Sequence, residues 1–238
     1  SLILFVIHKT IKMKYLISST ILATILFIAF SCSKEDLPDA AESNYLNYET
    51  KTALELPFDE EWWVFWGGRS VGENYHAAYK NQRFALDIVQ RVNGKTHTGN
   101  GSKNEDYYCF GKTLNAPGSG KIVTVVNNLE DNVPGQFNRD FPAGNHVVID
   151  HENGEFSFLA HFKKGTIIVS AGDAVSKGQE LGNAGNSGNS SEPHLHYHMQ
   201  TAKDHFEGEG LPAQFLNYYA NDTFVENGEP VRNQYIRK

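Results

Sequence analysis

Residues 146–162 read HVVIDHENGEFSFLAHF, and no other stretch indicates the fold class as directly. Two runs of β-branched and aromatic residues, 146–151 and 156–162, flank a polar segment that contains Asn153 and Gly154. Asn-Gly between two such runs is the strongest short signal for a tight turn joining antiparallel strands. The stretch therefore predicts a β-hairpin.

Short runs of the same kind lie on both sides of this hairpin. Strands are expected where β-branched and aromatic residues stand between turn-forming residues, at 61–66, 83–89, 121–126 and 194–200. No stretch shows the sustained 3.6-residue periodicity of an amphipathic helix. The sequence therefore predicts an all-β fold, a compact antiparallel sandwich or barrel-like domain with long loops.

The N-terminal part reads as a targeting segment. Residues 13–32 are MKYLISSTILATILFIAFSC, in which Lys14 precedes an apolar run that ends in small residues before Cys32. This is the layout of a secretory signal peptide, and its final cysteine makes it resemble a bacterial lipoprotein signal. A transmembrane anchor is the alternative, although such an anchor needs about 20 apolar residues. We expect residues 1–31 to be a cleaved signal peptide whose true start is Met13.

The expected domain organisation follows from this leader. Cys32 would carry a lipid anchor in the membrane and place the protein in the cell envelope, on the periplasmic or surface face of the outer membrane. The polar, acidic residues up to position 54 are predicted to form a flexible linker. Residues 55–205 would then form the main domain. Residues 206–238 are too few to fold alone, so we expect an extension packed on that domain.

Composition excludes several classes of function. The 238 residues include 21 Lys and Arg against 28 Asp and Glu, a formal net charge of −7, and the basic residues form no cluster. Binding to nucleic acid rests on neutralising phosphates, so no nucleic-acid partner is expected. The two cysteines cannot build a disulfide framework, and Cys109 is interpreted as a small buried residue.

A pattern of histidines carries the chemistry. In His194-Leu195-His196, the two histidines lie on the same face of a strand because side chains alternate between faces. A loop rich in Gly, Ser and Asn (183–193) precedes them, and His161 closes another predicted strand. Asp87 lies in a third strand.

These motifs resemble the lysostaphin/LytM-type zinc metalloendopeptidases, peptidoglycan hydrolases with a duplicated hybrid-motif β fold. The resemblance covers residues 55–205 and is most specific at Gly-Asn-Ser-Gly (185–188) before Pro-His-Leu-His. It implies that one zinc ion is held by the three residues His76, Asp87 and His196. It also implies that His161 and His194 are the catalytic histidines, without saying which is base and which is acid.

The implied function is zinc-dependent endopeptidase cleavage of peptide cross-links in bacterial peptidoglycan, by attack of zinc-bound water. Two imidazoles and one carboxylate leave a fourth position open on zinc, which is the catalytic pattern. One departure concerns His76, because ten residues separate it from Asp87 where many family members have three. His97 is the alternative ligand.

Two other functions are alternatives to this one. A catalytically silent relative would bind peptidoglycan or activate another wall hydrolase, and it would usually lack one of the five site residues. The run AGDAVSKGQELG (171–182) is also similar to the hybrid β-motif of lipoyl-type carriers and a phosphocarrier domain, but that carrier needs no signal peptide. A regulatory protein partner is left open. So is a supporting role for His198, whereas His205 is expected to be a solvated loop residue.

Overall fold

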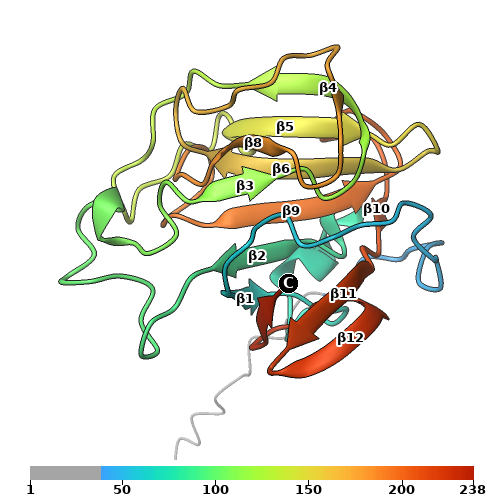
Figure 1. Cartoon of the computed structure of the whole chain (residues 1–238), viewed down its shortest axis with the longest axis horizontal. Helices are drawn as coiled ribbons and strands as arrows, with labels where there is room; N and C mark the ends of the chain where they lie inside the picture. The colour runs from blue at the N-terminus through green and yellow to red at the C-terminus, as the bar shows by residue number, and fades with distance from the viewer. Residues whose placement is uncertain (1–38) are drawn as a thin grey trace, which may run out of the picture. The chain divides into compact units, whose positions relative to one another are not determined.

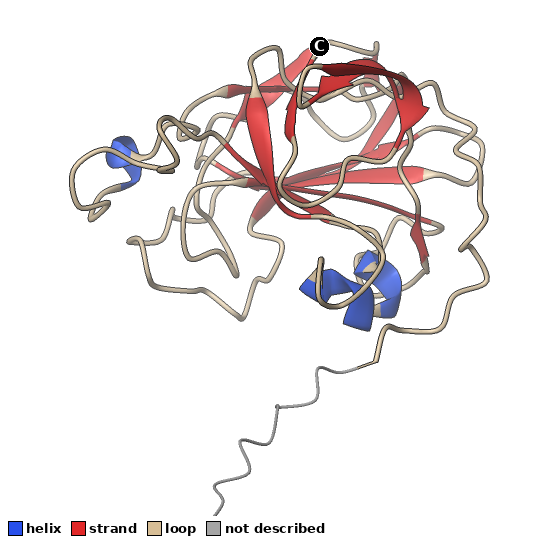
Figure 2. Cartoon of the chain, turned by 90° about the horizontal axis from the view of Figure 1, so that it is seen from below, coloured by secondary structure: helices blue, strands red, loops and turns tan. Residues whose placement is uncertain are grey.

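The computed structural model describes residues 39–238, and the expected signal peptide and Cys32 lie outside the described residues. The described chain forms strands, long loops and three short 3-10 helices (Figure 2). The strands are β1 (Trp62–Trp66), β2 (Leu86–Val89), β3 (Thr113–Asn115), β4 (Gly120–Val126), β5 (Asn145–Asp150), β6 (Phe156–Phe162), β7 (Ala174–Val175), β8 (Glu180–Asn183), β9 (Leu195–Gln200), β10 (Gly210–Leu211), β11 (Phe215–Ala220), β12 (Thr223–Gly228) and β13 (Tyr235–Arg237). The helices are η1 (Tyr75–Ala78), η2 (Lys80–Gln82) and η3 (Asn104–Asp106). None of the helices in residues 39–238 has the length and apolar character that crossing a bilayer requires.

One large antiparallel sheet dominates the domain (Figure 1). Its strand order is β12-β11-β13-β1-β2-β9-β6-β5-β4-β7, and β10 pairs with β9. The hairpin predicted from residues 146–162 is β5 and β6, in which Val147 lies opposite Leu159. The prediction of an all-β, antiparallel fold with long loops is confirmed.

The core lies between this sheet and a second sheet formed by β3 and β8, which Figure 1 draws over β5, β6 and β9. Leu181 of β8 is fully buried in the same apolar cluster as Leu195 and Tyr197 of β9. Because side chains alternate along a strand, His196 and His198 of β9 point to the opposite face of the sheet. That face therefore carries the polar chemistry, while the inner face is apolar.

The C-terminal residues extend the large sheet. β11 and β12 form a hairpin, and β13 pairs on one side with β11 and on the other with β1. Ile236 of β13 is fully buried and lies opposite Trp62. Residues 215–237 therefore complete one edge of the main sheet.

The segment that precedes β1 differs from the flexible linker predicted up to residue 54. Leu54 is fully buried in the core, and Glu155 in the β5–β6 turn fastens the residues before it. The buried Glu155 carboxylate accepts hydrogen bonds from the backbone N–H groups of Lys51 (2.7 Å) and Thr52 (2.9 Å) and from the Tyr48 hydroxyl (2.9 Å). A buried carboxylate is stable only with such donors. Residues 48–54 are therefore packed on the domain, and no local signal predicts this because the acceptor lies about a hundred residues further along the chain.

We expect Glu155→Gln to lower the free energy of unfolding by about 1–3 kcal/mol, because an amide cannot accept all of these hydrogen bonds. Urea unfolding measures the loss. Glu152→Gln, an exposed position in the same turn, is the matched control and should change little. Equal stability of the two variants would mean that Glu155 does not fasten this segment.

Candidate metal centre

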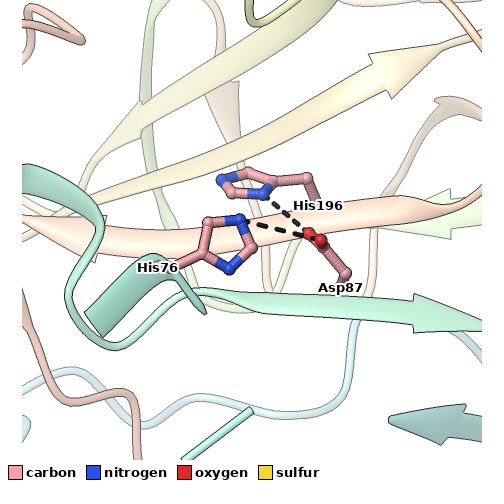
Figure 3. Close-up of side chains that lie close together, drawn as sticks. All are labelled: His76, Asp87 and His196. Atoms are coloured by element: carbon pink, nitrogen blue, oxygen red, sulfur yellow. Dashed lines mark hydrogen bonds and ion pairs between the residues drawn. The ribbon is translucent and has the colours of Figure 1, made fainter. Parts of the chain in front are cut away.

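Three separate elements bring His76, Asp87 and His196 together (Figure 3). Asp87 of β2 lies directly opposite His196 of β9 in the strand register. His76 comes from η1, in the loop that runs between β1 and β2. The ten residues between His76 and Asp87 comprise the end of η1, all of η2, a short connection and the first residue of β2.

The distances in this group suit a small cation. His76 Nε2 lies 3.6 Å from Asp87 Oδ2, and His196 Nδ1 lies 2.8 Å from Asp87 Oδ1. The three candidate ligand atoms all fall within 4.8 Å of one another. Ligands about 2.0–2.1 Å from a tetrahedral zinc ion are roughly 3.3 Å apart, so small side-chain movements would accommodate zinc. Within residues 39–238 this is the one group of three or more such side chains that could hold a metal ion.

Burial favours the protonation states that a metal ligand needs. His76 is only 1% exposed, and this burial lowers its pKa to about 3, so it is neutral at pH 7. Burial alone would raise the pKa of Asp87. Electrostatic interactions with the His76 and His194 rings and the hydrogen bond with His196 outweigh burial, so the pKa of Asp87 is held below its ordinary value. Neutral imidazoles beside an ionised carboxylate are the donor set of a zinc site.

Asn74 orients the His76 ring, a role that was not predicted from the sequence. Its Oδ1 accepts a hydrogen bond from His76 Nδ1 at 2.9 Å. Its Nδ2 donates to the carbonyls of Gly68 and Ala85, which fixes which end of the amide faces the ring. The proton of His76 is thereby placed on Nδ1, and Nε2 is free to face Asp87. The signal was weak, since Asn74 stands out only by lying two residues before His76.

His161 reaches this face of the sheet because β6 is irregular at its end. The register of β5 and β6 shifts by one residue, so that Asn145 pairs with Phe162 and His146 with Ala160, leaving His161 without a partner. His161 also has a φ of +66°, in the left-handed region that non-glycine residues rarely adopt. In a regular strand its side chain would point away from that of Ala160, so the bulge redirects it toward the metal residues.

The two remaining histidines face each other beside the metal group. The rings of His161 and His194 have centroids 4.6 Å apart, and His194 Nε2 lies 3.6 Å from Asp87 Oδ1. Nδ1 of His161 contacts the carbonyl of Ser187 at 2.7 Å, and Nδ1 of His194 contacts that of Glu192 at 2.9 Å. Since a carbonyl only accepts, each Nδ1 carries the proton and each Nε2 is left as a base. Burial lowers the pKa of His161 well below its usual value.

All five predicted site residues therefore lie together, and four of them line a cleft of about 750 Å3. Aromatic side chains of Trp63, Phe65 and Trp66 form part of its wall, so the aromatic first strand is only partly core. His97, the alternative ligand, also lines this cleft but stands outside the metal group. Cys109 is buried as expected, and its thiol lies 3.0 Å from the carbonyl of Pro193.

The buried histidines make the metal-free protein sensitive to acid. In the unfolded chain each would take up a proton near pH 6.5, whereas burial lowers the folded pKa of His76 to about 3 and that of His161 well below 6.5. The unfolded state then binds more protons, so stability falls as the pH decreases below about 6.5. We expect about 1.4 kcal/mol of lost stability per pH unit for each such histidine.

Urea unfolding in a chelator at pH 7, 6 and 5 measures this effect. His161→Asn removes one buried titrating group, and asparagine tolerates a positive φ, so the variant should show a shallower pH dependence. Unfolding midpoints that do not change between pH 7 and pH 5 would contradict the assignment of neutral buried imidazoles.

Part of the chain is similar to a known family of peptidases. The model of peptidase family M23 matches residues 102–207. The chain is 46% identical over 57 residues to the peptidoglycan DD-endopeptidase ShyA of Vibrio cholerae, an alignment that covers 24% of this chain and 13% of that protein. The chain thus spans only a small part of that curated relative. His76 and Asp87 precede the matched segment, so their inclusion in the site rests on the geometry described above.

Two peptidases are among the solved structures that align with this chain. A zinc-containing peptidase from Vibrio cholerae aligns with a TM-score of 0.43 and 20% identity, over 68% of this chain and 40% of that one. The catalytic domain of lysostaphin from Staphylococcus simulans aligns with a TM-score of 0.37 and 17% identity, over 64% of this chain and 88% of that one.

Proposed function

We propose that the protein is a zinc-dependent endopeptidase that hydrolyses the peptide cross-links of bacterial peptidoglycan, because the model of peptidase family M23 matches residues 102–207. The observation that carries the proposal is the convergence of a His-Asp-His group with two further histidines in one cleft. The match to a protein named as a peptidoglycan DD-endopeptidase supports the choice of substrate.

The metal would be held by His76, Asp87 and His196, whose donor atoms and burial fit zinc. When bound there, zinc supplies a Lewis acid that polarises a carbonyl and lowers the pKa of water from 15.7 to about 7. Asp87 contributes the negative charge of the site. Asn74 keeps His76 turned toward it through the hydrogen bond to Nδ1.

His161 and His194 carry the proton transfers. Hydrolysis of an amide requires one group to take a proton from the attacking water and another to give a proton to the departing amine. Each ring has its Nδ1 proton held by a carbonyl, which leaves Nε2 as the atom that exchanges protons. The two rings lie side by side, with centroids 4.6 Å apart, in the wall of one cleft, so both can reach the same substrate bond there. One serves as base and the other as acid.

The cleft that holds the site residues also has cationic side chains in its wall. Lys95 and Arg91 line it together with the aromatic side chain of Trp63. Cross-linked stem peptides carry free carboxylates, which such cations bind. The cleft therefore accommodates the peptide class of substrate that the proposal requires.

Digestion of purified sacculi tests the proposal. The protein is incubated with sacculi with and without a chelator, and the released fragments are identified by mass. We expect chelator-sensitive loss of cross-linked muropeptides and a gain of un-cross-linked ones. Zinc bound without any release would favour the catalytically silent, wall-binding alternative, and absence of both zinc and release would overturn the assignment of the site.

We also propose that Cys32 carries a lipid that holds the enzyme at the cell envelope, where its substrate lies. The support is the apolar run of residues 15–30 followed by a cysteine. Mass analysis of the mature N-terminus tests this idea. A mature chain that starts at an acylated Cys32 is expected, and an unmodified cysteine would contradict it.

A further inference from the structure

A third imidazole lies behind the metal group on the same strand. His198 of β9 is 1% exposed, and its Nδ1 lies 2.9 Å from Nε2 of His196. The ring of Phe158 stacks on it at 4.6 Å with an angle of 12° between the planes, which fixes the orientation of the imidazole. His198 therefore contacts the nitrogen of His196 that points away from Asp87.

His198 can form a hydrogen bond with His196 both without and with a metal ion, as donor in the first state and as acceptor in the second. Without a metal, His196 Nδ1 must donate to the Asp87 carboxylate, so a neutral His196 accepts at Nε2 from His198 Nδ1–H. With a metal on Nδ1, the proton of His196 stands on Nε2 and is donated to His198 Nδ1. An imidazole can act as donor or acceptor at Nδ1, so His198 satisfies His196 in both states.

Nε2 of His198 must then also change, from hydrogen-bond acceptor in the metal-free state to donor in the metal-bound state. His198 Nε2 and His205 Nδ1 are buried, and neither has a hydrogen-bond partner within bonding distance among the described residues. The Gln200 side chain influences His198, but its Oε1 is itself buried without a partner. The two rings have centroids 5.8 Å apart and both line a cavity of about 60 Å3. A water molecule needs about 10–15 Å3 of such space and two or more polar partners. The cavity meets both requirements.

A cation is a poorer occupant of this cavity than water. No Asp or Glu is found among the described residues that line it, so a buried positive charge would have no compensation. In the metal-holding state Nε2 of His198 also carries a proton and cannot be a ligand. Water can donate to Nε2 in one state and accept from it in the other.

We infer that His198 is a positioning residue for the metal ligand His196 and that a buried water joins it to His205. This inference rests on the metal site of the proposed function, but not on the substrate. His205, predicted from the sequence to be a solvated loop residue, instead closes the cavity beside Gln82, whose amide nitrogen lies 3.2 Å from its Nε2.

Zinc affinity tests the inference. Zinc alone is the probe, and its affinity for the full chain is measured by competition with a chromophoric chelator. His198→Phe removes the hydrogen bond and should weaken zinc binding by about 10–100-fold, the usual effect of losing such a partner. His198→Gln, whose amide offers both a donor and an acceptor, should restore the affinity to within a few fold of the wild type. His151→Phe is the matched control, because His151 is a buried histidine bonded to Ser119 and Ser157 rather than to a metal residue.

The absorption spectrum of the cobalt-substituted protein gives a second readout, since it reports ligand geometry. We expect it to change in His198→Phe and not in His151→Phe. Wild-type affinity and spectrum in a folded His198→Phe protein would overturn the inference, as would failure of His198→Gln to restore binding. A wild-type chain that binds no zinc would overturn the proposed function together with this inference. Zinc binding without peptidoglycan cleavage would overturn only the proposed function.

Discussion

Asp87→Ala is expected to abolish zinc binding and peptidoglycan cleavage together. Asp87 supplies the one negative charge of the His-Asp-His group and lies within 3.6 Å of both His76 Nε2 and His196 Nδ1. Its removal leaves two neutral imidazoles, so zinc affinity should fall by more than the roughly 10–100-fold that loss of an outer hydrogen bond costs. Metal content after dialysis and release from sacculi measure the two effects.

Asp173→Ala is the control for this variant, because Asp173 is an exposed carboxylate in the turn before β7. It should keep both zinc and activity. An Asp87→Ala protein that retains stoichiometric zinc would show that the ion is held elsewhere, and retained cleavage without zinc would show that the reaction does not need this group.

His161→Ala is expected to separate metal binding from catalysis. His161 stands beside the metal group but outside it, and its Nδ1 is occupied by the Ser187 carbonyl. The variant should therefore hold zinc with nearly wild-type affinity while kcat/KM falls by about 10²–10⁴-fold, the usual contribution of a general acid or base. Hydrolysis of a purified cross-linked muropeptide measures the rate.

His146→Ala on the adjacent strand β5 controls for loss of an imidazole near the site, since its Nδ1 contacts only the carbonyl of Gly144. Its rate should stay within a few fold of the wild type. Full activity in His161→Ala would remove this histidine from the reaction. Loss of zinc in that variant would move it into the metal group.

The hairpin of β5 and β6 and the strand β9 were predictable because their signals are local. Alternation, an Asn-Gly turn and the His-x-His spacing all act within a few residues of each other. The burial of Leu195 and Tyr197 with His196 on the opposite face follows from the same alternation. The local pattern thus gave both the fold class and the face of the sheet on which the histidines gather.

Features made by distant contacts were not predictable. The pairing of β13 with β1, and the fastening of Lys51 and Thr52 by Glu155, each join segments about a hundred residues or more apart. Nothing in the neighbouring residues specifies such a partner.

In the candidate site, too, local motifs were predictable and contacts between distant segments were not. Its five predicted side chains come from motifs, whereas Asn74 and the cavity between His198 and His205 depend on how η1, η2 and β9 pack. The bulge at His161 was also not predictable, because the residues around His161 have the pattern of a regular strand end. The motifs therefore predicted which side chains gather in the cleft but not the contacts that hold them in position.

The most direct measurement digests a purified cross-linked muropeptide dimer in water enriched in oxygen-18 and determines the product masses. Hydrolysis of the cross-link should give two monomers, with one solvent oxygen in the newly formed carboxylate of one product and none in the other. The reaction should stop with a chelator and return with zinc. Dimers that stay intact while zinc is bound, or products cut in the glycan, would contradict the assignment of this protein as a zinc endopeptidase.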